Sequence, residues 1–481
     1  MFDVIIIGGG VCGCSLLYEL SRYKINTLLI EKENDVSCGT SKANSAIVHA
    51  GYDPAPGTFM ARANVEGNAQ IEKLASDLDI MYKKTGSLVV GFDDDDRKSI
   101  EKLLEKGRKN GVPGLRIIEG DEIFKLEPNL SRDVKCALYA PSAGIVSPWE
   151  LASAQAECAI EGGAKVELDT EVTSIKKSGD GARGIFTVST NKGNFEAKYV
   201  VNAAGVNSDI VSEMAEKKHF KITPRSGEYF ILDTTERSFV NMIVFQCPSK
   251  LGKGVLVAPT VHGNVIIGPD SKEWKRDDYS TSRDGLDFVR RSATRVMPAI
   301  NLRASIRNFS GIRADAGLDD FIVGESKTTA GFFNMAGIKS PGLSSSTAIA
   351  KEVAKLIGEK IELKPNPNFV AKRKIVRFIH MSEAEKKAAI KENPLYGTII
   401  CRCETVTEGE IVDALRRPLP PRSLDALKRR CAAGMGRCQG GFCGPRVLAL
   451  IAKHLNLRPE DVPKDRQGMY IITGETKGAS K

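Results

Sequence analysis

The stretch that decides the fold is Asp-Val-Ile-Ile-Ile-Gly-Gly-Gly-Val-Cys-Gly at residues 3–13. Residues 4–7 form an unbroken β-branched run, which predicts a buried parallel strand. Residues 11–23 predict the helix that follows, and residues 27–30 predict a second strand. The chain is therefore expected to begin with a strand, a turn, a helix and a second strand.

The turn between the first strand and the helix has the spacing Gly-x-Gly-x-x-Gly at Gly8, Gly10 and Gly13. These glycines allow a tight turn, close approach of a pyrophosphate to the backbone, and close packing of helix on strand. The second strand ends at Glu31, where a carboxylate can accept hydrogen bonds from an adenosine ribose. Together these features predict dinucleotide binding. They do not distinguish FAD from NAD, and a glycine-rich turn without a ligand is the alternative.

The composition is that of an ordinary globular protein, with 42% hydrophobic and 27% charged residues in a chain of 481. This length accommodates roughly two to four domains. A run of 18 apolar residues is missing, so no transmembrane helix is expected. The N-terminus lacks the basic segment of a signal peptide, so the eleven cysteines are expected to be reduced in a cytoplasm.

Positive charge is concentrated near the C-terminus. The formal net charge is +9, and residues 371–481 alone contain 22 Lys and Arg against 12 Asp and Glu. The interleaved basic and aromatic residues of RNA-binding modules are missing there, so nucleic acid is not an expected partner. An acidic protein partner, or compensation for an anionic cofactor, fits this excess better, and an ordinary solvated surface is the alternative.

Beyond residue 225 the pattern changes to alternating strands, predicted at 227–232, 241–245, 255–258 and 264–267. Such a succession is typical of an antiparallel sheet. Residues 93–96 predict an acidic loop, and residues 364–369 predict a proline-containing linker. Ser382-Glu-Ala-Glu385 is a capping box, which predicts a helix that stops before Pro394.

Four cysteines give the strongest local metal signal, with the spacing Cys401-x-Cys403 and then Cys438-x-x-x-x-Cys443. Two close pairs of thiolates suit an iron–sulfur cluster or tetrahedral zinc. Cys431 lies off this pattern and is expected to be a packing residue. Cys12 and Cys14, on the helix after the glycine turn, are expected to lie in the core.

Two segments, Ile-Cys-Arg-Cys-Glu-Thr-Val-Thr at 400–407 and Gly-Met-Gly-Arg-Cys-Gln-Gly-Gly-Phe-Cys-Gly at 434–444, resemble the bacterioferritin-associated-ferredoxin-like [2Fe-2S] domain. The resemblance implies a [2Fe-2S] cluster on the four cysteines. The free-standing family usually has two residues between the last pair, whereas this chain has four. Four is the spacing of versions fused to amine and glycerol-3-phosphate dehydrogenases, so a ferritin-docking role does not follow.

The first 360 residues resemble the FAD-dependent D-amino-acid-oxidase-like superfamily, near its glycerol-3-phosphate oxidase/dehydrogenase and L-2-hydroxyglutarate dehydrogenase branch. Besides the opening stretch, the matching motifs are 40–51, 144–148, 202–205, 226–230, 311–313 and 337–343. The resemblance implies FAD rather than NAD. It assigns cofactor contacts to Gly8, Gly10, Gly13, Glu31, Lys32, Thr40, Ser41, Asn44, Ser45, Val172, Ala204, Gly205, Gly337, Pro341, Gly342, Leu343 and Ser344.

The same resemblance implies the catalytic residues. His49 matches the position of a base beside the flavin, where a neutral imidazole can take a hydroxyl proton near pH 7. A structural role and covalent flavin attachment are the alternatives for His49. Arg313 and Lys253 match positions that hold the anionic group of the substrate, and Ser340 matches a substrate-contacting position. A solvated surface charge is the alternative for each cation.

The expected fold class is α/β and α+β, with a Rossmann-like FAD-binding domain, an antiparallel-sheet substrate domain and a small helical Fe–S domain. The FAD-binding domain is expected at 1–82, 141–224 and 301–362, and the substrate domain at 83–140 and 225–300. The remaining parts are a linker and helix at 363–394, the [2Fe-2S] domain at 395–460, and a tail at 461–481.

The resemblance implies oxidation of glycerol 3-phosphate to dihydroxyacetone phosphate, with electrons leaving through the cluster. The expected acceptor is a second flavoprotein subunit, a quinone or a soluble carrier. The alternatives are a dehydrogenase of L-2-hydroxyglutarate or an amino acid, and a non-enzymatic flavin and iron–sulfur electron-transfer module. The expected location is cytoplasmic, with peripheral attachment to the inner membrane face left open.

Overall fold

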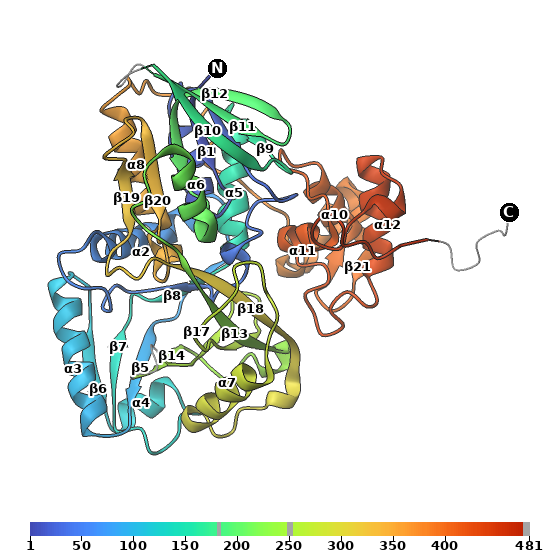
Figure 1. The fold of residues 1–481 in the computed structure, drawn as a ribbon. Helices are drawn as coiled ribbons and strands as arrows, with labels where there is room; N and C mark the ends of the chain where they lie inside the picture. Colours follow the sequence, from blue (N-terminus) through green and yellow to red (C-terminus); the bar gives the residue numbers. More distant parts are fainter. Residues whose placement is uncertain (180–183, 248–253, 475–481) are drawn as a thin grey trace.

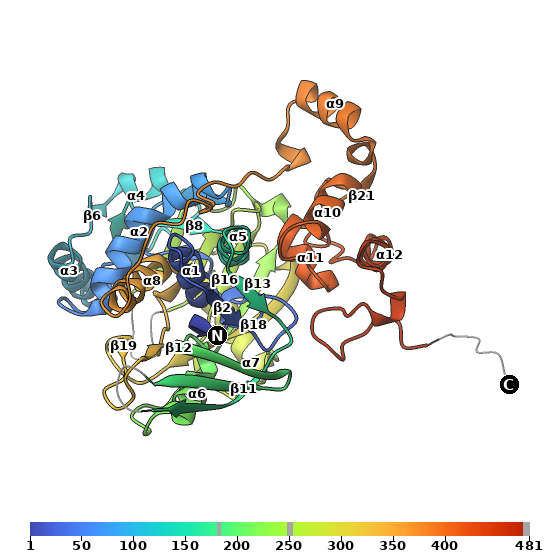
Figure 2. The same ribbon diagram turned by 90° about the horizontal axis from the view of Figure 1, so that it is seen from above.

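The computed structural model describes residues 1–179, 184–247 and 254–474. Two sheet-containing parts lie one above the other in Figure 1, and a small helical part formed by the C-terminal residues lies at their side. Figure 2 shows the same chain from above, with α9 (Glu383–Glu392) projecting from the body. No helix within the described ranges is long and apolar enough to cross a membrane.

The opening strand lies inside a mixed sheet. Its strands are β1 (Phe2–Ile7), β2 (Thr27–Ile30), β9 (Lys165–Glu167), β10 (Val172–Ser178), β11 (Ile185–Thr190), β12 (Gly193–Asn202), β19 (Ile322–Glu325) and β20 (Phe332–Ala336). β1 pairs in parallel with both β2 and β12, as the opening sequence predicts. Its side chains alternate between two cores, because Val4 and Ile6 pack on one face and Ile5 and Ile7 on the other.

Helices cover both faces of this sheet. The helices are α1 (Val11–Leu20), α2 (Phe59–Asp77), α5 (Pro148–Glu161), α6 (Ser208–Ala215) and α8 (Gly342–Gly358). α1, α2, α5 and α8 pack on the face of Val4, whereas α6 packs on the face of Ile5. This arrangement is the expected Rossmann-like α/β layer structure.

The second sheet is largely antiparallel, as expected. Its strands are β5 (Ser87–Gly91), β6 (Arg116–Glu119), β7 (Cys136–Ala140), β13 (Thr223–Leu232), β14 (Ile243–Gln246), β15 (Leu256–Pro259), β16 (Val265–Gly268), β17 (Lys272–Glu273) and β18 (Ser305–Asp315). The one parallel pair among them joins β14 to β5. The predicted boundary at residue 301 assigns β18 to the first domain, but its hydrogen bonds join it to β13 in this second sheet.

Helices α3 (Asp94–Lys109), α4 (Asp121–Leu126) and α7 (Arg283–Val296) belong to this second part. The predicted acidic loop at 93–96 is wrong, since Asp93 is the N-cap of α3 and accepts hydrogen bonds from the N–H groups of Asp95 and Asp96. Three acidic residues then occupy the first turn, where they complement the helix dipole. A small sheet of β3 (Ile47–Val48), β8 (Gly144–Val146) and β4 (Tyr82–Lys84) is separate from both large sheets.

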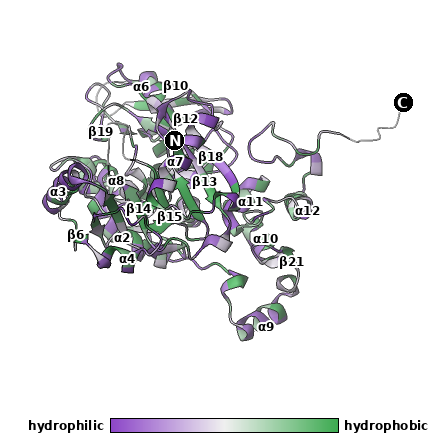
Figure 3. Cartoon of the chain, turned by 90° about the horizontal axis from the view of Figure 1, so that it is seen from below, coloured by the Kyte–Doolittle hydropathy of each residue, from purple (hydrophilic) through white to green (hydrophobic). Residues whose placement is uncertain are grey.

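The C-terminal part has its own small core. After α9 it contains β21 (Ile399–Cys401), β22 (Val406–Thr407), α10 (Glu408–Leu415), α11 (Leu424–Cys431) and α12 (Gly444–Leu455). The capping box at Ser382 and Glu385 is formed, and α9 ends before Pro394 as predicted. Short 3-10 helices complete the chain at 40–42, 205–207, 234–236, 302–304, 378–380, 394–397 and 459–461. In Figure 3 the inner strands β14 and β15 are green, whereas the outer helix α3 is largely purple.

Candidate functional site

The turn between β1 and α1 has no room for side chains at two of its glycines. Gly8 has a φ of +113°, and a Cβ there would lie 2.4 Å from the carbonyl oxygen of Ala203. A Cβ on Gly13 would lie 2.0 Å from the carbonyl oxygen of Gly8. Gly10 is the N-cap of α1 and offers no capping side chain. Of the first-turn N–H groups of α1, that of Val11 donates to Ser41 Oγ, which leaves those of Cys12 and Gly13 for an anion such as a pyrophosphate.

Glu31 lies beside this turn at the end of β2. Its Oε2 accepts from the N–H of Gly9 at 2.6 Å, and its Oε1 accepts from the N–H of Glu33 at 3.0 Å. Burial raises the pKa of Glu31, and these two backbone hydrogen bonds oppose the rise. The carboxylate is thus held beside the glycine turn, where the sequence predicts a dinucleotide ribose. Neighbouring Lys32 is exposed, and the side chain of Val172 packs in the core beside Ile30.

The loop at 40–45 lies between the glycine turn and the second sheet. Ser41 Oγ accepts from the N–H of Val11, and Thr40 Oγ1 donates to the carbonyl of Ile312 on β18. Asn44 Nδ2 donates to the carbonyls of Thr40 and Ser41, each at 3.0 Å. Ser45 Oγ is 3.2 Å from the hydroxyl of Tyr229. This loop therefore connects the predicted pyrophosphate site to the predicted substrate domain.

A second glycine-containing segment, 337–344, leads into α8 and contacts His49 through Ser340 and Ser344. Gly337 has a φ of +63°, and a Cβ on Gly342 would lie 2.4 Å from the Cγ2 of Ile338. Pro341 is the N-cap of α8, and Leu343 is half-buried beside it. Ser344 Oγ accepts from the backbone N–H of His49 at 2.7 Å. The remaining predicted cofactor contacts are Ala204, which is half-buried, and Gly205, which is exposed. They lie close to the glycine turn, since a Cβ on Gly8 would lie 3.1 Å from the Cα of Ala204.

Contacts to both its backbone and its ring hold His49 in place. Its backbone carbonyl accepts from Nδ2 of Asn64 at 2.9 Å and of Asn68 at 3.1 Å, both on α2. Its ring stacks on Phe245 with the two centroids 5.8 Å apart. Its Nε2 is 3.2 Å from Oγ of exposed Ser340. Nε2 of the imidazole therefore lies at hydrogen-bond distance from a hydroxyl group. A base that removes the proton of an alcohol must bind a hydroxyl group in this way.

Arg313 lies on β18, next to the residue that Thr40 contacts. Its guanidinium donates to the carbonyl of Asp270 at 2.8 Å and to the hydroxyl of Ser271 at 3.1 Å. No carboxylate within the described ranges lies within 4.0 Å of it as an ion-pair partner. Gly227 makes room for it, since a Cβ there would lie 2.1 Å from Nη2. The second predicted cation, Lys253, lies outside the described residues.

The four predicted cysteine ligands form two pairs. Cys403 and Cys438 are exposed, with their sulfur atoms 3.8 Å apart. Cys401 and Cys443 are buried and hydrogen-bonded to each other. That hydrogen bond from Cys443 is the main cause that lowers the pKa of Cys401 to about 6, and burial opposes it. Two close pairs of thiols suit an iron–sulfur cluster or tetrahedral zinc. Within the described residues, no three His, Cys, Asp or Glu side chains lie close enough together to hold one metal ion.

The model of the FAD dependent oxidoreductase family matches residues 3–356 of this chain. The chain belongs to this family. The model of the BFD-like [2Fe-2S] binding domain matches residues 399–453. Both expected cofactors, FAD and a [2Fe-2S] cluster, are confirmed at the level of these families.

Individual relatives agree with this assignment. A glycerol 3-phosphate dehydrogenase of Caloramator mitchellensis is 48% identical over 481 residues, which is 99% of each chain. A glycerol 3-phosphate oxidase of Mycoplasma genitalium is 32% identical and covers 76% of this chain and 98% of its own. A solved structure of the dithionite-reduced L-alpha-glycerophosphate oxidase of Mycoplasma pneumoniae, with FAD bound, has a TM-score of 0.74 and 29% identity. It covers 78% of this chain and 99% of its own.

In this FAD-dependent oxidoreductase the cluster domain is joined to the FAD-binding domain by buried charges. Asp35, which follows β2, accepts from Arg430 at 2.7 Å and from Arg429 at 3.0 Å, both on α11. Glu157 on α5 accepts from Arg430 Nε at 3.1 Å. These four side chains are at most 6% exposed. Burial opposes ionisation of Asp35, but Arg430 and Arg429 outweigh it and hold its pKa below the ordinary value.

The chain beyond α12 adds a second connection. Asp465 accepts from Lys42 Nζ at 2.6 Å, and its backbone carbonyl accepts from Asn34 Nδ2 at 2.7 Å. Lys42 belongs to the same loop as Ser41, so the tail contacts the predicted flavin loop directly. The sequence does not predict either connection. The only local signal is the adjacent pair Arg429–Arg430 on an otherwise amphipathic helix, and it does not identify a partner.

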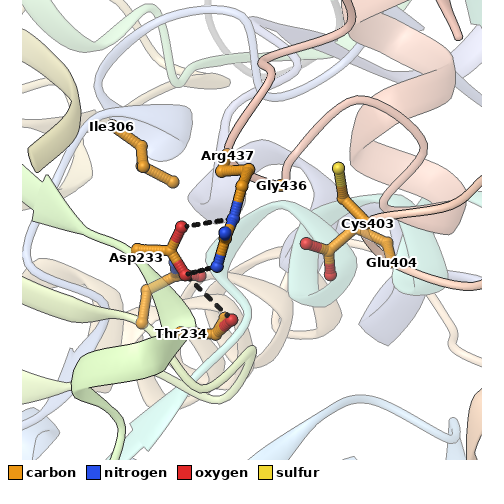
Figure 4. Close-up of a pocket in the computed structure, with 8 residues that line it drawn as sticks. Asp233, Thr234, Ile306, Cys403, Glu404, Gly436 and Arg437 are labelled. Carbon is orange, nitrogen blue, oxygen red and sulfur yellow. Dashed lines mark hydrogen bonds and ion pairs between the residues drawn. The ribbon is translucent and has the colours of Figure 1, made fainter. Parts of the chain in front are cut away.

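A cavity of about 250 Å³ separates the cluster domain from the second sheet. It is lined by Asp233, Thr234, Asn264, Ile306, Cys403, Glu404, Gly436 and Arg437. Figure 4 shows Arg437 pointing across it to Asp233, with which it forms an ion pair at 3.0 Å. Cys403 and Glu404 lie on the opposite side. This cavity borders the cysteine site and shares no lining residue with the space around His49.

Proposed function

We propose that this chain is an FAD-dependent glycerol-3-phosphate dehydrogenase that oxidises sn-glycerol 3-phosphate to dihydroxyacetone phosphate. The observation that carries the proposal is the similarity to a glycerol 3-phosphate dehydrogenase over 99% of both chains, which includes the cluster domain. The fixed position of His49 supports the chemistry. The fused cluster domain supports a dehydrogenase that delivers electrons to a partner, rather than an oxidase.

The residues around the dinucleotide turn fit FAD. Gly8 and Gly13 allow the backbone of the turn to pack closely, Gly10 places no side chain at the N-terminus of α1, and Glu31 is positioned for the ribose. FAD bound there supplies the acceptor for a hydride, and a [2Fe-2S] cluster on the four cysteines supplies a one-electron carrier. The assignment of individual residues to these cofactors is part of the proposal.

His49 removes the hydroxyl proton of the substrate at Nε2. In that role Nε2 carries no hydrogen, so Ser340 Oγ donates to it across their 3.2 Å separation. The two asparagines on the carbonyl of His49 and the ring of Phe245 restrict its movement. This restriction pre-orients the base for a substrate hydroxyl that takes the place of Ser340.

Arg313 binds the phosphate of the substrate. Its hydrogen bonds to the Asp270 carbonyl and to Ser271 hold the guanidinium in place. A guanidinium presents several N–H donors in a plane, which suits phosphate or carboxylate oxygens. Lys253 is proposed as a second cation, which favours a dianionic phosphate over a single carboxylate.

An anaerobic reduction experiment tests the proposal. Glycerol 3-phosphate is expected to bleach the flavin absorbance of the purified holoenzyme at least as fast as the enzyme turns over. L-2-Hydroxyglutarate and amino acids are expected to leave that absorbance unchanged. Bleaching by L-2-hydroxyglutarate without bleaching by glycerol 3-phosphate would show that the chain belongs to the hydroxyacid branch.

A further inference from the structure

The cysteine site has a buried side and an exposed side. Cys401 and Cys443 are 1% and 2% exposed and pack in the small C-terminal core. Cys403 and Cys438 are exposed. A cluster held by these cysteines would therefore exchange electrons with another molecule through the side that carries Cys403 and Cys438.

An aromatic ring with two cations lies next to this exposed side. Phe442 lies between Cys438 and Cys443 in the sequence and is 52% exposed. The guanidinium groups of Arg402 and Arg446 lie over its ring, 5.0 Å and 5.7 Å from the centroid. Both arginines are exposed, and no carboxylate in the part of the chain that the structure describes forms an ion pair with either.

We propose that this cluster-edge surface, formed by Arg402, Cys403, Cys438, Phe442 and Arg446, docks an acidic one-electron carrier protein. The inference rests on the proposed function and identifies the class of its electron acceptor. An exposed aromatic side chain flanked by arginines is typical of protein–protein contact residues. The unpaired positive charge selects a partner with a complementary acidic face and steers its approach.

An anionic membrane fits the cluster-edge surface less well than an acidic protein does. Electrostatic membrane attachment in proteins uses clusters of four to eight basic residues, whereas two arginines flank Phe442. The nearby cation Arg437 is already paired with Asp233. The surface thus matches a small acidic patch on a protein better than an extended anionic plane.

The electron balance requires two encounters for each turnover. Oxidation of one secondary alcohol to a ketone releases two electrons and two protons. Each oxidised carrier takes one electron at the cluster-edge surface and leaves reduced. Two carrier molecules are therefore consumed for each ketone formed, and the two protons pass to solvent.

The test uses the soluble domain of cytochrome b5 as an acidic haem carrier and cytochrome c as a basic one. The holoenzyme is expected to bind and reduce the acidic carrier in preference to the basic one at low ionic strength. The binding is expected to weaken with salt, because the Debye length falls from about 30 Å at 0.01 M to about 10 Å at 0.1 M. Equal or tighter binding of cytochrome c would overturn the proposal.

The decisive variant is Arg402→Glu combined with Arg446→Glu in the full chain. We expect its Kd for the acidic carrier, measured calorimetrically, to rise about tenfold. The matched control reverses two exposed charges on α9, with Lys387→Glu and Lys391→Glu, and is expected to leave Kd unchanged. An unchanged Kd in the arginine variant would overturn the proposal. So would binding to anionic phospholipid vesicles that the arginine variant loses, because the occupant would then be a membrane.

Two further readouts separate this proposal from the proposed function. The EPR signal of the reduced cluster in the arginine variant should equal that of the wild type, which shows that the domain is folded. Flavin bleaching by glycerol 3-phosphate should also be unchanged. If bleaching fails in the wild type, the substrate assignment is wrong; if bleaching persists and carrier binding is insensitive to the arginines, only the docking proposal is wrong.

Discussion

The two predicted redox sites of this chain are built in opposite ways. The dinucleotide turn is built from glycines and backbone groups. It follows β1, whose side chains pack in two buried cores, with Val4 and Ile6 on one face and Ile5 and Ile7 on the other. The cysteine site consists of four reactive side chains on one small core, and two of them are exposed. The comparison shows that close packing defines the first site, whereas side-chain ligands and charge define the second. Each can therefore be disrupted without the other.

The largest effect is expected from Gly13→Ala at the dinucleotide turn. The new Cβ would lie 2.0 Å from the carbonyl oxygen of Gly8, which backbone cannot accommodate without moving the turn. We expect loss of bound FAD and of all substrate oxidation, with the EPR signal of the cluster retained. The control is Gly39→Ala, because no atom lies within 4 Å of a Cβ there. Normal FAD content in the Gly13 variant would show that packing does not define this site.

Cys438→Ser is the reciprocal change. We expect the visible absorbance and EPR signal of the cluster to disappear, since a serine hydroxyl is a poor substitute for a thiolate ligand. FAD content and anaerobic bleaching of the flavin by substrate should persist. Cys431→Ser serves as the control, because the Cys431 thiol donates to the Leu427 carbonyl, a hydrogen bond that a hydroxyl can replace. A cluster that survives in the Cys438 variant would remove this residue from the ligand set.

His49→Ala tests whether the first site is catalytic. Loss of a general base is expected to lower the rate of flavin reduction by substrate about 10²- to 10⁴-fold. FAD content should be unchanged, because Ser344, Asn64 and Asn68 contact only the backbone of His49, which the substitution keeps. Stopped-flow absorbance measures the rate, and exposed His219→Ala is the control. An unaltered rate would support the alternative of a non-enzymatic electron-transfer module.

Asp35→Ala tests whether the buried ion pairs hold the cluster domain on the FAD-binding domain. It leaves Arg429 and Arg430 buried without this carboxylate, which is expected to cost about 3–5 kcal/mol of domain docking. Limited proteolysis between residues 363 and 382 should then become faster. The control is Asp461→Ala, since its ion pair with Arg458 is exposed and should contribute nothing measurable. Equal proteolysis of the Asp35 variant and the wild type would show that other contacts hold the cluster domain.

The same junction should respond to pH. The pKa of Asp35 is lower in the folded chain than in the unfolded one, so its contribution to stability is present above about pH 4. The contribution is lost as pH falls through the folded pKa. Wild-type proteolysis in the linker should therefore accelerate below about pH 4, and the Asp35 variant should lack this step.

Local patterns in the sequence predicted both sites because each depends on spacing along the chain. Gly8, Gly10 and Gly13 act within one turn, and the four cysteines form two sequence-local pairs that the fold brings together. The strands from residue 225 onward were predicted from their alternation for the same reason. The acidic run at Asp93 resembles a loop in the sequence, but Asp93 is an N-cap and the aspartates after it form the first turn of α3.

Contacts between distant segments could not be predicted. Asp35 and Arg430 are 395 positions apart, and neither has a local motif that signals a buried ion pair. The stacking of Phe245 on His49 likewise depends on how the second sheet packs against the first. The position of His49 came from resemblance to a family, and its role as base stays a prediction, as does that of Lys253.

Electrons are expected to enter beside His49 and to leave through the four cysteines. An anaerobic stopped-flow experiment with glycerol 3-phosphate tests this electron path most directly, because flavin and cluster absorb at distinguishable wavelengths. In the wild type we expect flavin reduction first and cluster reduction afterwards. In Cys438→Ser we expect flavin reduction alone, and in His49→Ala we expect both steps to be slower than in the wild type. Cluster reduction that precedes flavin reduction, or a wild-type flavin that glycerol 3-phosphate does not reduce, would exclude this electron path.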